Sequence, residues 1–251
     1  MIRVAFALLL LALASAGHAH AQDFEREARW RAEVVPGLVA GEAVDIPGPG
    51  GRVFLGLLTE PSGADPGSTT LLVIVHGIGV HPDHGIIGKL RMDLADKGYA
   101  TLAIQMPVLA SDAPADHYEP LFANAAERIA NAAAWARDRG YRDLMLVSHS
   151  LGSRMANAYF DRTQAPGFRA WAALGLGVPF SSTFAQAPRV PVLDVYGERD
   201  LDPVLKSAPA RERIASASGG RQQRIAGADH FYAGREADVV TLIAVFARPR
   251  P

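Results

Sequence analysis

A serine at position 150 occupies a turn where its hydroxyl group could act as a nucleophile. It follows the apolar run DLMLV, residues 143–147, and precedes RMANAYF, residues 154–160, whose pattern is helical. Small residues lie two positions before it and two after it, at Ser148 and Gly152. A sharp strand-to-helix turn needs small neighbours, because it brings backbones together and lifts the central side chain above the sheet. The usual residue two before the nucleophile is glycine, so we expect glycine to be tolerated at position 148.

The helix that starts here would direct its free backbone N–H groups and its positive dipole end toward Ser150. A serine at this point can also simply cap the helix, because serine is a preferred N-cap residue. A nucleophilic serine needs a base to take its proton and a carboxylate to hold that base. The presence of these two partners decides between the two interpretations.

An aspartate and a histidine follow two later apolar segments. Asp200 lies in GERD, at the end of the strand pattern PVLDVYG, and His230 lies in GADHFY, at the end of the strand pattern RQQRIAG. With Ser150 they give the chain order Ser, Asp, His, each just past the end of a different predicted strand. This order and context predict a catalytic triad of Ser150, Asp200 and His230.

Two other aspartates lie close to Asp200 in the sequence. Asp194 falls inside the apolar segment, so we expect its side chain along the sheet and away from the strand end. Asp202 precedes Pro203, which is typical of an N-cap before a proline at the first helical position. Asp200 is therefore the predicted acid, and Asp202 the predicted helix cap.

The segment HGIG, residues 76–79, directly follows the apolar run LLVIV. Glycines allow backbone N–H groups to approach a ligand closely. We expect the N–H groups of Ile78 and Leu151 to form an oxyanion hole, which stabilises negative charge on a reacting carbonyl oxygen. His76 is expected to shape this loop and not to act as a base.

Alternating strands and helices are needed to position these residues, and the sequence has that alternation from residue 69 onward. It predicts crossover connections and a mostly parallel sheet covered on both faces, with chemistry at the carboxyl ends of the strands. Two leading strands without a helix between them predict an antiparallel edge. The predicted strands cover residues 43–46, 52–60, 69–77, 99–107, 143–148, 168–177, 191–197 and 221–227, and the main predicted helices 84–98, 119–140, 153–163, 204–217 and 236–247.

The chain resembles the α/β-hydrolase superfamily over roughly residues 42–247, and the resemblance rests on HGIG, SHSLG, YGERD and GADHF taken together. Within it, HGIGVHPD followed by GYATLAIQMP is similar to a group of exported bacterial proteins of poorly defined function. The resemblance implies an α/β-hydrolase fold with a doubly wound sheet of about eight strands. It also implies hydrolysis of an ester, thioester or amide through an acyl-enzyme, without a cofactor, on a small-molecule substrate.

Two other functions stay open at this point. The first is a metal-dependent hydrolase, because three histidines and an aspartate, all of metal-ligand types, lie within nine residues. They are His76, His81, Asp83 and His84. Their spacing matches no zinc pattern, so no metal site is assigned. The second is a non-catalytic binding protein on a hydrolase fold, because folds are reused for unrelated functions.

The region around residues 177–190 is too short for the helical lid that many members of the superfamily insert there. We therefore expect no lid domain and a shallow pocket bounded by short loops. Phe180 and Phe184 are predicted to contact the substrate, and the Pro- and Ala-rich segment 105–120 is predicted to form the opposite wall. The sequence does not identify the acyl or alcohol group.

The first 21 residues have the layout of a secretory signal peptide: a basic start, an apolar run of 11 residues from Val4 to Ala14, and Ala19-His20-Ala21. A membrane span needs ~20 apolar residues. We therefore expect export to the periplasm or the medium, with residues 22–251 as one α/β-hydrolase domain and no stable membrane span after cleavage. A retained membrane anchor is the alternative.

The charge and the cysteine content of the sequence exclude some classes of partner and of cross-link. The formal net charge is −1 and no block of like charge exists, so nucleic acid is not an expected partner. The sequence contains no cysteine, so an exported chain would be held together by its core without disulfides. The oligomeric state does not follow from the sequence.

Overall fold

Eight strands form one sheet in the order β1-β2-β4-β3-β5-β6-β7-β8. The computed structural model describes residues 22–248, and the predicted signal peptide lies outside them. β1 pairs antiparallel with β2, and β2 pairs antiparallel with β4. All other neighbouring strands are parallel. The predicted fold class, including the antiparallel edge, is confirmed, and the described residues contain no separate lid domain.

The elements follow the predicted alternation closely. The strands are β1 (Glu42–Pro47), β2 (Val53–Thr59), β3 (Leu71–Val75), β4 (Ala100–Ile104), β5 (Leu144–His149), β6 (Ala170–Leu174), β7 (Val192–Arg199) and β8 (Arg221–Asp229). The helices are α1 (Phe24–Val34), α2 (Gly85–Asp96), α3 (Phe122–Asp138), α4 (Leu151–Arg162), α5 (Ser182–Gln186), α6 (Asp202–Ala217) and α7 (Glu236–Phe246). Short 3₁₀ helices cover Val35–Gly37, Pro49–Gly51 and Ala115–Leu121.

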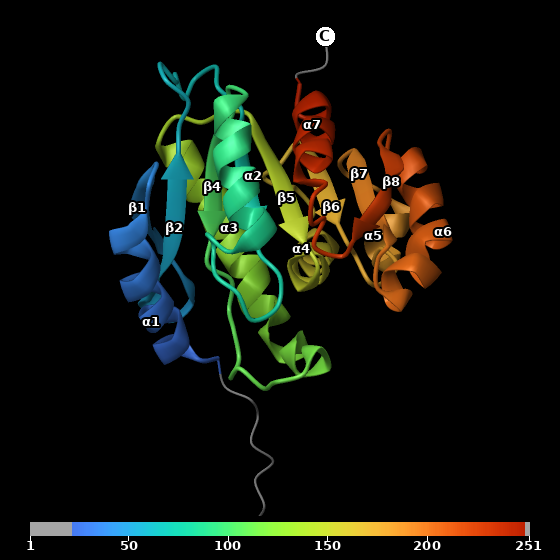
Figure 1. Ribbon diagram of the computed structural model, residues 1–251, viewed down its shortest axis with the longest axis horizontal. Helices are drawn as coiled ribbons and strands as arrows, with labels where there is room; N and C mark the ends of the chain where they lie inside the picture. The colour runs from blue at the N-terminus through green and yellow to red at the C-terminus, as the bar shows by residue number, and fades with distance from the viewer. Residues whose placement is uncertain (1–21, 249–251) are drawn as a thin grey trace, which may run out of the picture.

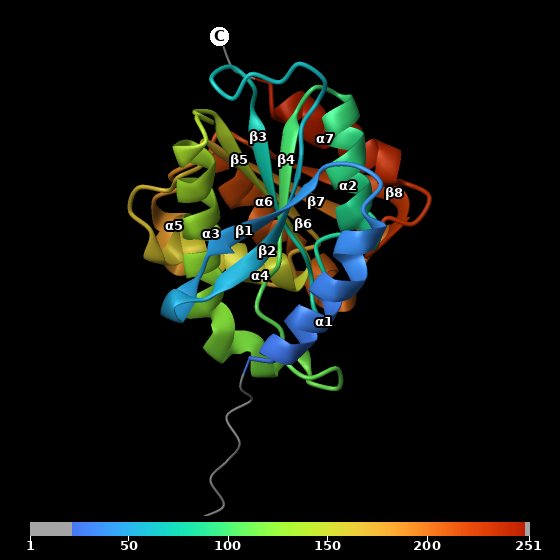
Figure 2. The same cartoon turned by 90° about the vertical axis from the view of Figure 1, so that its left-hand side faces the viewer.

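Helices cover both faces of the sheet (Figure 1), which is why its central strands β3 and β5 are buried along their whole length. Side chains of α3, α4, α5 and α6 contribute to one apolar core, and side chains of α1, α2 and α7 contribute to the other. Figure 2 shows α3 on one side of the sheet and α2 on the other. Alternate residues of one strand serve the two cores, as Val73 and Ile74 do, because successive side chains of a strand point to opposite faces. Within residues 22–248, no helix is long and apolar enough to cross a membrane.

The parallel register brings the ends of the central strands to one edge of the sheet. Ser148 of β5 lies opposite Val75 of β3 on one side and Ala173 of β6 on the other. The residues just past the ends of β3, β5, β7 and β8 are therefore carried to the same edge. These are His76, Ser150, Asp200 and His230, the residues around which the sequence predicts the chemistry.

A buried ion pair joins β7 to α6. The Nε of Arg211 lies 3.0 Å from both carboxylate oxygens of Asp194, and both side chains are fully buried. The side-chain amide of Gln222 in β8 donates to the same carboxylate at 2.7 Å. Asp194 lies along the sheet as predicted, and its carboxylate is engaged far from the strand end.

Asp202 is not the N-cap that the sequence predicts. It is the first residue of α6, Leu201 occupies the cap position, and no side-chain capping hydrogen bond forms. The exposed Asp202 carboxylate instead pairs with Lys206 one turn later, at 3.0 Å. The helix therefore begins one residue earlier than the Asp-Pro pattern indicates, and Asp202 contributes charge near the helix start without capping it.

We predict stability effects of very different size at these two ion pairs. Arg211→Met would leave the buried Asp194 carboxylate without its partner and should lower the free energy of unfolding by about 3–5 kcal/mol. Asp202→Ala removes only an exposed pair one turn apart and should change it by less than about 0.5 kcal/mol. Urea denaturation of both variants measures this. Similar losses in the two would contradict the assignment of Asp194 and Arg211 as the structural pair.

Candidate active site

Ser150 sits in a strained turn between β5 and α4. Its φ of 56° and ψ of −123° lie outside the regions that non-glycine residues favour. Its backbone N–H donates to the carbonyl of Leu174 at 2.9 Å, which ties the turn to the end of β6. A Cβ on Gly152 would lie 2.3 Å from the carbonyl oxygen of His76, so only glycine allows α4 to pack this closely against β3. Ser150 makes no side-chain capping bond, which leaves its hydroxyl free for another partner.

Ser148 does more than supply a small side chain. Its hydroxyl accepts a hydrogen bond from the indole N–H of Trp171 at 2.9 Å and lies 3.0 Å from the hydroxyl of Ser153. All three side chains are buried. Glycine at position 148 would leave the indole N–H without this acceptor, which costs about 1–3 kcal/mol for a buried group. Ser148→Gly is therefore expected to lower the free energy of unfolding. The sequence does not indicate this loss, because Trp171 approaches Ser148 only in the folded protein.

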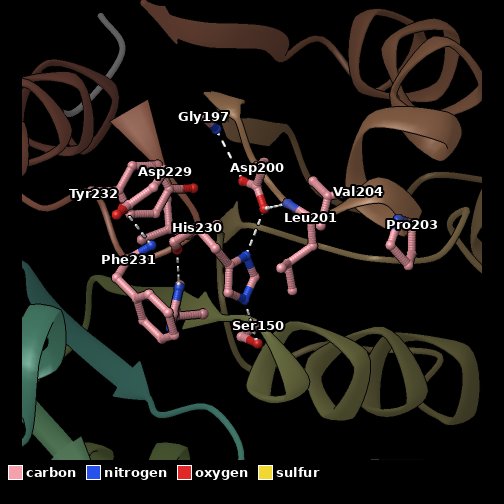
Figure 3. A network of polar contacts seen from close by, with 12 residues as sticks. Ser150, Gly197, Asp200, Leu201, Pro203, Val204, Asp229, His230, Phe231 and Tyr232 are labelled. Carbon is pink, nitrogen blue, oxygen red and sulfur yellow. Dashed lines mark hydrogen bonds and ion pairs between the residues drawn. The ribbon is translucent and has the colours of Figure 1, made fainter. Parts of the chain in front are cut away.

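Ser150, His230 and Asp200 form a continuous row, as Figure 3 shows. The Nε2 of His230 lies 2.8 Å from the Oγ of Ser150, and its Nδ1 lies 2.6 Å from the Oδ1 of Asp200. The Asp200 carboxylate also accepts backbone N–H groups of Gly197 at 3.0 Å and Leu201 at 2.8 Å. Burial opposes ionisation of this carboxyl, but the hydrogen bonds from His230 and the backbone outweigh it and hold its pKa below the usual value. An ionised Asp200 fixes the His230 tautomer that carries its proton on Nδ1.

The loop that carries His230 is held from several directions. The Oδ1 of Asp229 accepts the backbone N–H groups of Phe231 at 2.9 Å and Ala233 at 3.2 Å. Tyr232 has a φ of 58°, and its buried hydroxyl donates to the carbonyl of Val195 at 3.0 Å. His149, next to Ser150, lies with its Nε2 2.9 Å from the carbonyl oxygen of His230. These contacts keep the imidazole of His230 within reach of the serine.

The loop after β3 lies directly against Ser150. A Cβ on Gly77 would lie 3.1 Å from the Cβ of Ser150, so the predicted oxyanion loop contacts the serine. His76 shapes this loop as expected: its Nε2 accepts the backbone N–H of Met106 at 2.8 Å, and its Nδ1 donates to the carbonyl of Gly77 at 2.9 Å. Burial lowers the pKa of His76 to about 3, so this imidazole is neutral and both of its nitrogens are already engaged.

A cavity of about 430 Å³ opens beside Ser150 and His230. This volume is within the usual range for small-molecule sites. The lining residues come from the loop between β3 and α2, the start of α2, Leu201, and the segment from His230 to Glu236. Leu201 and Phe231 are not among the predicted contacts, although each directly follows a predicted triad residue in the sequence. That adjacency is the sequence feature from which they could have been inferred.

The residues predicted to form the pocket walls do not line this cavity. Phe180 and Phe184 are buried in an aromatic cluster, with ring centroids 5.5 and 6.0 Å from Trp171, and neither lines the cavity. Segment 105–120 does not line it either. The broad ring of Trp171 on β6 offers the two phenylalanines an apolar partner inside the core, where their burial is more favourable than exposure at a pocket wall.

Solved structures with the same arrangement of strands and helices identify the fold. An α/β serine hydrolase homologue from Coxiella burnetii matches with a TM-score of 0.62 and 17% identity, over 83% of this chain and 98% of that one. A dienelactone hydrolase from Anabaena variabilis matches with a TM-score of 0.64 and 21% identity, over 81% and 94%. The esterase domain of a Rhodothermus marinus protein matches with a TM-score of 0.61 and 16% identity, over 82% and 97%.

The chain has the α/β-hydrolase fold. No protein-family model matches the sequence, and no curated protein matches it at the level required for a significant similarity. At identities this low, the likeness establishes the fold alone.

Side chains of the histidine-rich loop after β3 are engaged with neighbouring residues of the protein. Among residues 22–248, no group of three or more His, Cys, Asp or Glu side chains is arranged to hold a metal ion. Asp83 pairs with the buried Arg91 at 2.7 Å, and the ring of His81 contacts the rings of Trp30 and His84, with centroids 5.8 and 5.5 Å away. These contacts hold the loop in place, and no arrangement of side chains in residues 22–248 favours the metal-dependent alternative.

We predict that acid destabilises the protein through two buried imidazoles. Burial lowers the pKa of His76 to about 3, and burial together with the neighbouring His230 lowers the pKa of His149 to about 4. In the unfolded chain both bind protons below about pH 6.5, whereas the folded chain does not until far lower pH. The unfolded state then binds more protons, so stability falls as the pH falls. Urea denaturation should show a loss of about 2 kcal/mol per imidazole between pH 7 and pH 5.

Nuclear magnetic resonance supplies the control for this prediction. The ring protons of His76 and His149 should show no titration between pH 8 and pH 5 in the folded protein. An unchanged free energy of unfolding over this range, or titration of both rings near pH 6.5, would contradict the prediction.

Proposed function

We propose that the chain is a serine hydrolase that cleaves carboxylic esters through an acyl-enzyme. The observation that carries this proposal is the row of Ser150, His230 and Asp200, joined by contacts of 2.8 and 2.6 Å. The comparisons give general support, because the similar structures are described as a serine hydrolase homologue, a dienelactone hydrolase and an esterase domain.

In the proposed reaction, the Oγ of Ser150 attacks the ester carbonyl carbon while the Nε2 of His230 accepts the hydroxyl proton. Asp200 accepts the hydrogen bond from Nδ1 and stabilises the imidazolium that forms. The imidazolium then gives its proton to the alcohol oxygen as the carbon–oxygen bond breaks. A water molecule, deprotonated by the same imidazole, attacks the acyl-enzyme, releases the acid and restores the serine.

Negative charge on the carbonyl oxygen needs hydrogen-bond donors. Leu151 is the first residue of α4, and a backbone N–H in the first turn has no acceptor within the helix. It also lies at the positive end of the helix dipole. Ile78 lies next to Gly77, which packs against Ser150, so its N–H is the second proposed donor.

The alternative of a non-catalytic binding protein receives less support. Binding alone does not require a hydroxyl, an imidazole and a carboxylate in hydrogen-bond contact at the end of three strands. The same steps would cleave a thioester or an amide, and an ester is preferred to an amide because an alcohol leaves more easily than an amine. Export to the periplasm or the medium, through the signal peptide predicted in residues 1–21, belongs to the same proposal and rests on the sequence alone.

We predict that Ser150→Ala abolishes hydrolysis of p-nitrophenyl acetate and labelling by a fluorophosphonate, which reacts with an activated serine. The fall in turnover should be at least ~10³-fold, because no other nucleophile is proposed. The free energy of unfolding should stay within about 0.5 kcal/mol of the wild type, because the Ser150 hydroxyl makes no capping bond. A metal chelator should leave wild-type activity unchanged.

Ser181→Ala is the matched control. Ser181 caps α5, and its side chain accepts the N–H of Phe184. This variant should lose about 1 kcal/mol of stability and keep its activity. If Ser150→Ala behaved like Ser181→Ala, Ser150 would be a helix cap and the proposed function would be wrong.

A further inference from the structure

Three large apolar side chains stand exposed around the mouth of the cavity beside Ser150. Ile78, Leu201 and Phe231 keep 36%, 53% and 66% of their surface exposed, and all three line the cavity. They come from three different loops: Ile78 carries a proposed oxyanion N–H, Leu201 follows the acid Asp200, and Phe231 follows the base His230. Exposed apolar side chains that gather at one concave site mark a binding surface for an apolar group.

The inner wall of the same cavity is also apolar. Ile86 and Ile87, at the start of α2, line it and are buried. A chain that enters between the three rim residues would therefore meet apolar surface along its length. Each methylene group that leaves water for such a surface contributes favourably to binding.

The lining of the cavity carries a negative charge. Glu236 lines it from the first turn of α7, and no lysine or arginine is among the lining residues that the structure describes. Lys89 on α2 is near enough to interact electrostatically with Glu236, but its ammonium group lies 2.6 Å from the Asp93 carboxylate. A second negative charge brought into the cavity would find no cation there to balance it.

We propose that this cavity selects uncharged esters that carry an apolar chain, and disfavours esters whose chain ends in a carboxylate. The inference rests on the proposed function, because it assigns the substrate class of the same site. Phe231 and Leu201 determine the chain-length preference, and Glu236 determines the charge preference.

Chain length is tested with two ester series, since either side of the ester could occupy the cavity. One runs from p-nitrophenyl acetate to hexanoate, and the other from ethyl to hexyl acetate. In one series kcat/KM should rise roughly threefold for each buried methylene group. Phe231→Ala and Leu201→Ala should remove most of this rise, so that the rates for long and short esters become similar. Val39→Ala, at an exposed valine that does not line the cavity, is the control. It should change neither the rise of kcat/KM with chain length nor kcat/KM for the shortest ester.

Charge is tested with the carboxylate-tipped analogue of the preferred chain, such as the p-nitrophenyl monoester of succinate against the butanoate. Glu236→Gln should raise kcat/KM for the anionic substrate, relative to the neutral one, roughly fivefold to tenfold. Glu25→Gln, at an exposed carboxylate on α1, is the matched control.

The outcomes separate this inference from the proposed function. If no ester is cleaved and Ser150 is not labelled, the proposed function fails. If Ser150 is labelled and short esters are cleaved, but both series are flat or the Phe231 variant slows all esters alike, the inferred substrate class is wrong. An unchanged anionic rate in Glu236→Gln overturns the charge preference.

Arg26 on α1 contacts two loops near the proposed active site. The guanidinium of Arg26 donates through Nη2 to the carbonyl of Gly79 at 3.1 Å and through Nη1 to the carbonyl of Leu109 at 2.8 Å. It also lies over the ring of Trp30, 4.5 Å from the centroid. The planar guanidinium thus joins the proposed oxyanion loop to the loop after β4, and the ring of Trp30 packs against its face.

We infer that Arg26 is a positioning residue for the N–H of Ile78. Ile78 directly precedes Gly79, so the bond to the Gly79 carbonyl restrains the peptide units beside the proposed donor. An oxyanion donor acts on the transition state more than on the ground state, so its displacement lowers kcat with little change in KM.

The test compares Arg26→Met with Arg29→Met, an exposed arginine on the same helix. Arg26→Met should lower kcat for p-nitrophenyl butanoate about tenfold or more, keep KM within twofold, and weaken inhibition by a phenylboronic acid by a similar factor. Arg26→Lys, which keeps the charge but loses the planar pair of donors, should recover only part of the rate. Arg29→Met should match the wild type.

Folded protein is confirmed for each variant by circular dichroism before the kinetics. An unchanged kcat in folded Arg26→Met overturns the inference, as does a rate loss without a change in boronic acid inhibition. Absence of wild-type activity and of labelling would instead overturn the proposed function.

Discussion

The turn at Ser150 is the constraint on which the rest of the site depends. A non-glycine residue at a φ of 56° carries backbone strain, and it persists only where the surroundings fix it. Here the Ser150 N–H is bound to Leu174, and Gly152 packs against the carbonyl of His76 more closely than any other residue could. The same packing brings the loop after β3 against the serine. One crowded turn therefore sets both the direction of the hydroxyl and the position of the proposed oxyanion loop.

The loops around this turn hold one another in place. His149, beside the serine, contacts the carbonyl of His230, so the segment that bears the serine also supports the segment that bears the base. Asp200 is held by two backbone N–H groups as well as by His230, which keeps it ionised and oriented. Buried groups with every hydrogen bond satisfied resist rearrangement, since breaking one bond exposes a polar atom to an apolar interior. This rigidity is what a site needs to stabilise a transition state.

The sequence predicts the sheet and the row of Ser150, Asp200 and His230, because chain order and strand ends fix where those residues lie. It does not predict the pocket. Phe180 was expected at a wall and lies in the core, because its partner Trp171 is close only in the fold. Asp202 has a cap pattern, but the helix begins one residue earlier than that pattern indicates. Contacts made through tertiary packing, such as the indole of Trp171 on Ser148, leave no mark in local sequence.

The measurement that tests the central claim most directly is the kinetics and stability of Asp200→Asn. If the row works as a triad, the amide favours the wrong His230 tautomer, and kcat/KM for p-nitrophenyl butanoate should fall by up to ~10⁴-fold, as in serine proteases. The rate of fluorophosphonate labelling should fall in parallel, while the free energy of unfolding should change far less than in Arg211→Met. A variant that keeps its catalytic rate and loses mainly stability would show that the carboxylate of Asp200 is structural, and would contradict the account.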